Sequence, residues 1–238
     1  SIGKNGEVEF RSKQLTPLGY TSTPIKILDA TGDPKSAYQL IRRGPNAWDK
    51  EQELKVVKLD VPWNSHRVHI QISTGKSVME RMKVKYLKKL LNEMLSHTEA
   101  KKVMLITHKF LKGKAIEILK GIAPNREFMG YHFFGPRGVN DYKDCDVALV
   151  LGLPYANLNS AAQDACILFP NEQDEDLRFD WPEATMQWEL IQNIHRIRPV
   201  NKEERIVDIV IAARSWPSIL PKPDLVINRS QSKSWKEL

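Results

Sequence analysis

Apolar and polar positions follow two different periods in the second half of the chain. From residue 101 onward, short apolar runs such as VMLITH, EFMGYHFF and DVALVLGLP are separated by segments with helical spacing such as KFLKGKAIEILKG. Buried apolar runs that alternate with helices are typical of a parallel sheet with crossover helices. A further β-rich run, RIVDIVIAAR, follows a long helical segment. The pattern therefore predicts an α/β fold, a parallel sheet flanked by helices.

The first part of the chain has a different pattern. The segments LKVVKLDVP and HRVHIQI alternate with period two, which predicts strands, and a short apolar run at residues 25–28 predicts another. Residues 1–24 alternate weakly and carry turn residues, which indicates a hairpin or an irregular segment. We therefore expect a β-rich lead-in before the main sheet.

A helix is predicted over residues 77–97, directly after the strand HRVHIQI. Its apolar stripe faces the core, with basic residues outside it, and consists of Met79, Met82, Tyr86, Leu90 and Met94. The tripeptide Gly75-Lys76-Ser77 resembles the end of a phosphate-binding loop, but Ile70 stands where such a loop needs glycine. We expect a strand-to-helix turn here, with Ser77 as the helix cap.

Composition adds a few limits to this picture. The chain has 238 residues, 41% of them hydrophobic, and a net charge of +7, which favours a polyanionic partner without identifying it. Its two cysteines lack metal or disulfide spacing, and no stretch approaches the ~20 apolar residues of a membrane span. His66 and His69 project to opposite faces of a predicted strand, so we expect no metal site there. The expected setting is cytoplasmic or another reducing intracellular compartment.

The strongest candidate for chemistry is the segment QWELIQNIHRIRPV. Its core-facing positions, at helical spacing, are Met186, Leu190, Ile194 and Ile197. Gln192, His195 and Arg196 share another face at i, i+3 and i+4. Pro199 disfavours helix at Arg198, so the helix should end there with two arginines near its terminus. Such a pair suits phosphate oxygens, whereas the alternative is a solvated basic helix end.

This helix and the preceding RGVNDYKDCDVALVLGLP resemble the last two motifs of superfamily 2 helicases. In that family an R-G-[ILV]-D loop, an apolar strand and Leu-Pro form motif V, and Q-x-x-G-R-x-x-R on a helix forms motif VI. Arg137, Gly138, Val139 and Asn140 stand at the first pattern, and Leu153-Pro154 close it. Gln192 and Arg196 stand at the second. Residues 103–108 resemble the motif IV strand, and Ala30-Thr31 resemble motif III.

The resemblance implies a role for each matching residue. Arg196 would be an arginine finger on the γ-phosphate of ATP, Gln192 would position the nucleotide or water, and Arg198 would contact phosphate. Nucleotide-binding residues would be Arg137, Gly138, Asn140 and His195. Asp29 and Thr31 would couple hydrolysis to movement of the strand. ATP and Mg²⁺ would be bound mainly by a first RecA-like domain, since this sequence has no Walker A loop before motif III.

Four positions depart from the family patterns. Asp29 replaces serine in motif III, Asn140 replaces aspartate in motif V, and His195 replaces glycine in motif VI. Arg198 lies one residue earlier than the usual second arginine. These departures keep a non-catalytic docking module open as an alternative.

The resemblance also implies an organisation and partners. Residues 1–75 would hold the motif III strand and a connecting segment, residues 76–215 the second RecA-like domain, and residues 216–238 a peripheral tail. The partners would be the first RecA-like domain and nucleic acid, with DNA favoured over RNA because the common RNA-helicase pattern is missing. Three tryptophans are further candidates for base stacking, although aromatic residues are more often core: Trp181, Trp188 and Trp216.

Overall fold

The computed structural model describes residues 63–136, 140–155, 160, 162–163, 165–166, 175–199 and 206–229. The chain divides into two compact units, one of residues 1–59 and 156–185 and one of residues 60–155 and 186–238. The predicted lead-in, the strand at residues 25–28 and the segment LKVVKLDVP lie outside the described residues, as do Asp29, Thr31, Arg137 and Gly138. The second unit contains the sheet.

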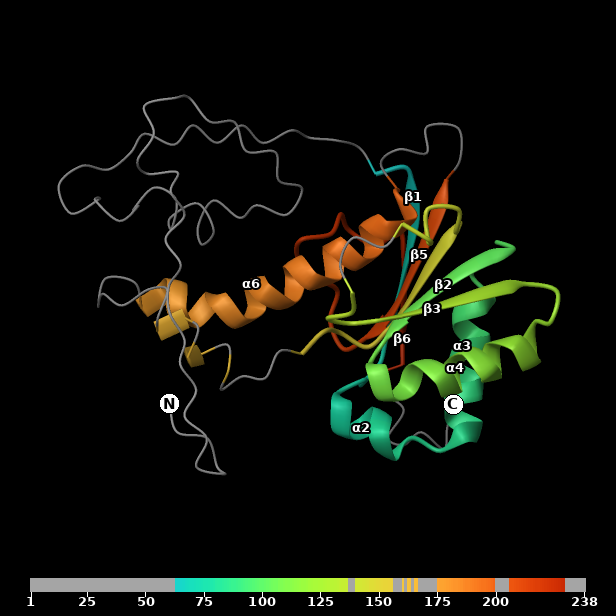
Figure 1. Cartoon of the computed structure of the whole chain (residues 1–238), viewed down its shortest axis with the longest axis horizontal. Helices are drawn as coiled ribbons and strands as arrows, with labels where there is room; N and C mark the ends of the chain where they lie inside the picture. The colour runs from blue at the N-terminus through green and yellow to red at the C-terminus, as the bar shows by residue number, and fades with distance from the viewer. Residues whose placement is uncertain are drawn as a thin grey trace. The chain divides into compact units, whose positions relative to one another are not determined.

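Six strands in the described part of the chain form one sheet, and every neighbouring pair in it is parallel (Figure 1). The order across the sheet is β3-β2-β4-β5-β1-β6. The strands are β1 (Ser65–Gln71), β2 (Lys102–Thr107), β3 (Glu127–His132), β4 (Val147–Leu151), β5 (Val207–Ala213) and β6 (Leu225–Asn228). This confirms the predicted α/β fold.

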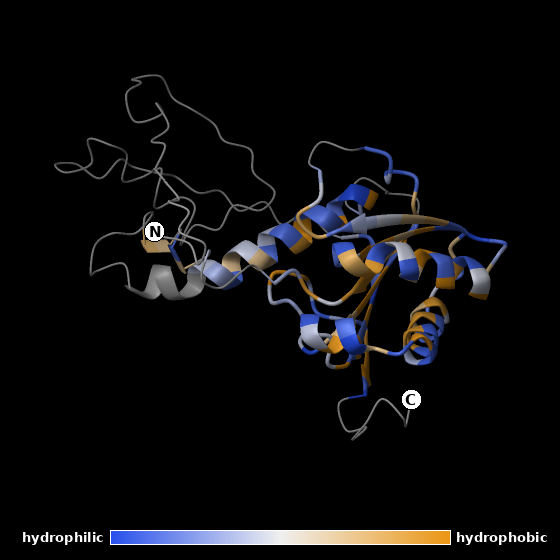
Figure 2. Cartoon of the chain, turned by 60° about the horizontal axis from the view of Figure 1, so that its bottom comes forward, coloured by the Kyte–Doolittle hydropathy of each residue, from blue (hydrophilic) through white to orange (hydrophobic). Residues whose placement is uncertain are grey.

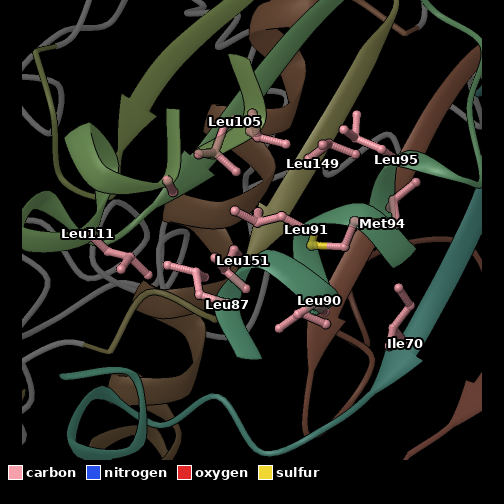
Figure 3. Close-up of a cluster of buried hydrophobic side chains, with 14 of the residues drawn as sticks. Ile70, Leu87, Leu90, Leu91, Met94, Leu95, Leu105, Leu111, Leu149 and Leu151 are labelled. Carbon is pink, nitrogen blue, oxygen red and sulfur yellow. The ribbon is translucent and has the colours of Figure 1, made fainter. Parts of the chain in front are cut away.

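One face of the sheet is covered by α2 (Lys76–Arg81), α3 (Val84–Leu95) and α4 (Lys109–Ile122). Helices α3 and α4 lie beside one another (Figure 1). Figure 3 shows leucines of α3, including Leu87 and Leu91, gathered with Leu149 and Leu151 of β4. These four side chains are fully buried, and each contributes about 1.5–3 kcal/mol of burial free energy.

The opposite face carries the second core cluster, to which α6 (Glu175–Ile194) and the 3₁₀ turn η3 (His195–Ile197) contribute. Leu190, Ile194 and Ile197 are buried there against residues of β2, β4 and β5, as the apolar spacing predicts. Met186, predicted to face the core with them, is only half-buried and lies outside this cluster, whereas Ile191 belongs to it. Figure 2 shows hydrophobic colour concentrated on the strands and on one side of the helices. Among the described helices, none has both the length and the apolar character needed to cross a bilayer.

The helix after β1 differs from the prediction. Residues 77–97 do not form one helix, because the backbone of Met82 and Lys83 is extended between α2 and α3. Met79 and Met82 are both buried, so the apolar stripe continues across the break. Ser77 lies inside α2 and is not its cap, since Gly75 holds the cap position and its carbonyl accepts from the next turn.

The sheet extends beyond residues 76–215 in both directions. Strand β1 precedes that range and lies between β5 and β6, and β6 follows it. Asp224, just before β6, receives hydrogen bonds from the backbone N–H and guanidinium of Arg67 in β1 at 2.8–3.0 Å. The residues around β6 are thereby fixed to the sheet.

Candidate functional site

The described sheet has one edge at which ligands are expected. All six strands are parallel, so their carboxyl ends lie together. After the neighbouring strands β2 and β4, the chain continues to opposite faces of the sheet. Helix α4, which follows β2, covers one face, and helix α6, which lies between β4 and β5 in sequence, packs on the other. Open α/β sheets bind ligands outside the carboxyl ends at such a reversal. In sequence, the segments that resemble motifs V and VI lie between β3 and β5; residues 137–139 of the first are outside the described residues.

Arg196 is bound to the end of β3 and to the segment that follows it. Its Nη2 donates to the Tyr131 hydroxyl at 2.6 Å and to the Pro136 carbonyl at 3.0 Å. The guanidinium carbon lies 4.2 Å from the centroid of the Tyr131 ring, an attractive cation–π geometry. Tyr131 also donates its hydroxyl hydrogen to the Pro136 carbonyl at 2.7 Å. Arg196 is therefore positioned directly beside the residue that precedes Arg137.

A second residue of α6 holds the same turn. Buried Glu189, 7% exposed, accepts the backbone N–H of Phe134 at 2.6 Å and the side-chain amide of Asn193 at 2.9 Å. Phe134 has a φ of 58°, a left-handed conformation that costs a non-glycine residue about 1–3 kcal/mol. Glu189 and Arg196 thus fix residues 134–136 from the same helical segment.

His195 points to a different neighbourhood. Its ring makes an edge contact with Trp63, with centroids 4.9 Å apart, and burial lowers the pKa of His195 below its ordinary value of 6.5. The Nε2 atom is buried without a hydrogen-bond partner. This environment favours the neutral imidazole.

The remaining predicted residues are less closely held. Gln192 is half-buried, one turn before Arg196 on α6. Arg198 is exposed and left-handed, with φ 53°, and its N–H donates to the His195 carbonyl at 2.9 Å. The helical run therefore stops at the position that Pro199 predicts. Asn140 is exposed, and its carbonyl accepts the Lys143 N–H at 3.4 Å.

His108 occupies the carboxyl end of β2. Its ring stacks with Phe110, with centroids 5.6 Å apart, and meets Phe133 edge-on at 5.2 Å. Burial is the main cause that lowers the pKa of His108, and the charge of Lys76 adds to it. Gly152, after β4, has a φ of 87°, and a Cβ there would lie 3.2 Å from His108 Nε2. Glycine therefore permits both the turn and the position of the His108 ring.

No sequence pattern pointed to Tyr131, which contacts Arg196, or to Glu189, which holds the adjoining turn at Phe134. Tyr131 and Glu189 read as ordinary strand and helix positions, and their role depends on how α6 packs against the end of β3. Trp216, proposed for stacking, is half-buried and donates to the Pro221 carbonyl at 3.0 Å. His69, also set aside as a ligand, is buried with Nε2 3.1 Å from the Ala213 carbonyl.

No group of three His, Cys, Asp or Glu side chains with metal-binding geometry is found among the residues that the structure describes. The side chains described at this edge include the guanidinium of Arg196 and the rings of Tyr131, Phe110 and Phe133. Comparison of the chain with family models, with curated proteins and with solved structures finds no match.

Proposed function

We propose that this chain is the C-terminal motor half of an ATP-dependent nucleic-acid helicase or translocase. In this role it supplies Arg196 to a nucleotide held by a first RecA-like domain and offers a nucleic-acid-binding surface. DNA is favoured over RNA as the nucleic acid, because the sequence lacks the motif pattern that is common in RNA helicases.

One observation carries the proposal. Arg196, from the stretch that resembles motif VI, donates to the carbonyl of Pro136, which immediately precedes the Arg137-Gly138 pair that resembles motif V. Residues 60 positions apart in sequence are thus adjacent beside the carboxyl edge of a parallel sheet. A motor of this type needs both motifs at one site.

Arg196 can exchange its present hydrogen-bond acceptors for the oxygens of a phosphate. Its Nη2 now donates to two neutral oxygens, a hydroxyl and a carbonyl. A charged phosphate oxygen is a stronger acceptor than either, and hydrogen bonds to ionised groups are roughly twice as strong as neutral ones. The Tyr131 ring would support the guanidinium during this exchange.

ATP and Mg²⁺ fit this half only in part. Mg²⁺ prefers carboxylate and water oxygens, and the described residues hold no cluster of that kind. The proposal therefore assigns the metal and most nucleotide contacts to the first domain. Bound ATP would supply the phosphoryl group that is transferred to water. This chain would contribute Arg196 to stabilise charge, and Gln192 and Arg198 beside it.

The alternative is a non-catalytic α/β module for docking nucleic acid or protein. The contacts of Arg196 with Tyr131 and Pro136 favour it, because they give the side chain a structural role within the domain. In that case Arg196 would brace the turn, and its loss would reduce stability instead of turnover.

ATP hydrolysis in the full natural polypeptide separates the two functions. We would compare the wild type with Arg196→Ala, with and without single-stranded DNA. The motor proposal expects DNA-stimulated turnover that falls by about 10³-fold or more in the variant. Absent turnover, or turnover that Arg196→Ala leaves intact, would contradict it and support the docking module.

Arg126→Ala is the matched control. Arg126 is also half-buried, and its Nη1 donates to the Thr98 carbonyl at 2.9 Å, but at the amino edge of the sheet. Its loss removes a comparable structural contact. A similar fall in turnover in both variants would mean that general destabilisation explains the Arg196 result.

A further inference from the structure

The exposed aromatic side chains of the described residues gather in one region. Phe110 is 46% exposed, Phe134 50% and Tyr155 44%, and no other large aromatic side chain described in the structure is as exposed. Each follows the carboxyl end of a strand by two to four residues, after β2, β3 and β4 respectively. The other large exposed apolar residues are aliphatic: Val84, Ile206, Leu225 and Val226.

These three strands are neighbours, in the order β3-β2-β4. Strands in a sheet are about 4.8 Å apart, so the ends of the three lie within roughly 10 Å of one another. Ring contacts also join the first two ends. Phe110 stacks on His108, and His108 meets Phe133, the residue before Phe134. Phe110 is thereby linked to the segment that carries Phe134, and Tyr155 follows the end of the adjacent strand β4.

The backbone of Phe134 gives independent support for a role. A left-handed φ of 58° is unfavourable for phenylalanine, and half of the ring remains in water. The N–H of Phe134 is nevertheless held by buried Glu189, which fixes this conformation. Strained residues that the surrounding structure fixes cluster at binding and catalytic sites.

Two lysines lie close to His108, one next to it in sequence and one through its charge. Lys109 is exposed between His108 and Phe110, and the charge of Lys76 is close enough to lower the pKa of His108. Lys76 also lies 3.9 Å from Glu80 but remains largely exposed. Flat apolar rings next to cations match a ligand that alternates planar bases with phosphates.

We propose that Phe110, Phe134 and Tyr155, called here the aromatic edge, stack on unpaired bases of a single-stranded nucleic acid, while Lys76 and Lys109 contact its phosphates. Stacking on aromatic rings tolerates any base, so the edge grips a strand without reading its sequence. The proposal rests on the proposed function, which supplies the nucleic acid. Its test measures binding and not ATP turnover, so its failure can be distinguished from failure of the motor proposal.

The test compares two fluorescent 20-mers by anisotropy, oligothymidylate and an abasic strand with the same sugar-phosphate backbone. The wild-type protein should bind oligothymidylate more tightly, by about 5- to 150-fold for each stacked base. Phe110→Leu and Phe134→Gly should reduce this preference. Their affinity for the abasic strand should be unchanged, because the phosphate contacts remain.

Phe134→Gly is chosen because glycine adopts the left-handed backbone without strain, so the fold is retained when the ring is lost. Ile206→Ala is the control, an exposed apolar position beside the amino end of β5. It should keep the preference for bases.

Equal wild-type affinity for the two strands would overturn the stacking proposal and leave a phosphate-binding surface. A preference that survives in both phenylalanine variants would also overturn it. Binding of neither strand would overturn it together with the nucleic-acid part of the proposed function, and would point to a protein partner at this edge.

Discussion

Arg196 contacts both the ring and the hydroxyl of Tyr131: the guanidinium carbon lies 4.2 Å from the ring centroid, and Nη2 donates to the hydroxyl oxygen at 2.6 Å. The ring comes from β3 and the arginine from the turn after α6. Their contact therefore joins the end of β3, where the long β3–β4 connection begins, to η3, the turn that precedes β5.

The first prediction concerns the Tyr131 hydroxyl. Tyr131→Phe removes the bond from Arg196 and the bond to Pro136 but keeps the ring. We expect the free energy of unfolding to fall by about 1–3 kcal/mol, since one lost bond is charge-assisted. Urea unfolding measures this. Tyr142→Phe, which loses one neutral bond to the Gly130 carbonyl at 3.2 Å, should cost less; an equal loss would argue against a special role for Tyr131.

The second concerns the buried carboxylate of Glu189. Glu189→Ala leaves the Phe134 N–H and the Asn193 amide without their acceptor, which should cost about 1–3 kcal/mol of unfolding free energy. Exposed Glu117→Ala on α4 should stay within about 0.5 kcal/mol of the wild type. Thermal unfolding of the two variants side by side gives the comparison. A mild effect of Glu189→Ala would show that the turn is held by other contacts.

The third isolates the strain at Phe134. Both Phe134→Gly and Phe134→Ala remove the ring, but glycine alone relieves the left-handed backbone. We therefore expect Phe134→Gly to be more stable than Phe134→Ala by about 1–2 kcal/mol. Chemical denaturation of the pair measures the difference. Equal stability would mean that this backbone carries no strain.

The fourth concerns pH. Burial lowers the pKa of His195, and likewise of His69 and His108, below the ordinary value of 6.5. Just below pH 6.5 the unfolded chain therefore binds more protons than the folded protein. The stability that these neutral, buried histidines contribute is fully present above pH 6.5. It is lost as the pH falls from 6.5 towards the lowered pKa values of the folded protein.

The measurement is the urea midpoint between about pH 7.5 and 5. His195→Phe keeps a ring against Trp63 but cannot bind a proton, so its midpoint should fall less than that of the wild type over this range. Above pH 7 the two pH dependences should be parallel. An equal fall in both proteins would show that His195 does not contribute.

The pattern of apolar residues was sufficient to predict β2, β3, β4, β5 and α4, because these are buried apolar runs and a helix of clear period. The end of the helical run before Pro199 was also predictable from local sterics. The break at Met82 was not, since no glycine or proline marks it and the buried stripe is the same on both sides. The predicted domain, residues 76–215, leaves out β1 and β6, because the pairing of these two strands depends on contacts between distant parts of the sequence.

The candidate site was predictable only in part. Spacing on the helix identified Gln192, His195 and Arg196, but the contacts of Arg196 come from Tyr131 and Pro136 across the fold. Phe134 gave no signal, because phenylalanine is not a residue that sequence associates with a left-handed turn. Roles that arise from tertiary contacts have no local pattern to reveal them. The assignments of Asp29, Thr31, Arg137 and Gly138 stay predictions.

The position of β1 has a consequence for how the chain folds during synthesis. Ser65 pairs with Val207, and Val68 pairs with Leu225, so both neighbours of this strand are made long after it. While the ribosome is still adding α4, β3 and β4, β1 has no native neighbour on either side. Closing such large loops is slow, and unpaired strand edges make a partly folded chain prone to aggregation. We therefore expect nascent chains released before β5 to need chaperones, and the sheet to be completed only once residue 228 has emerged.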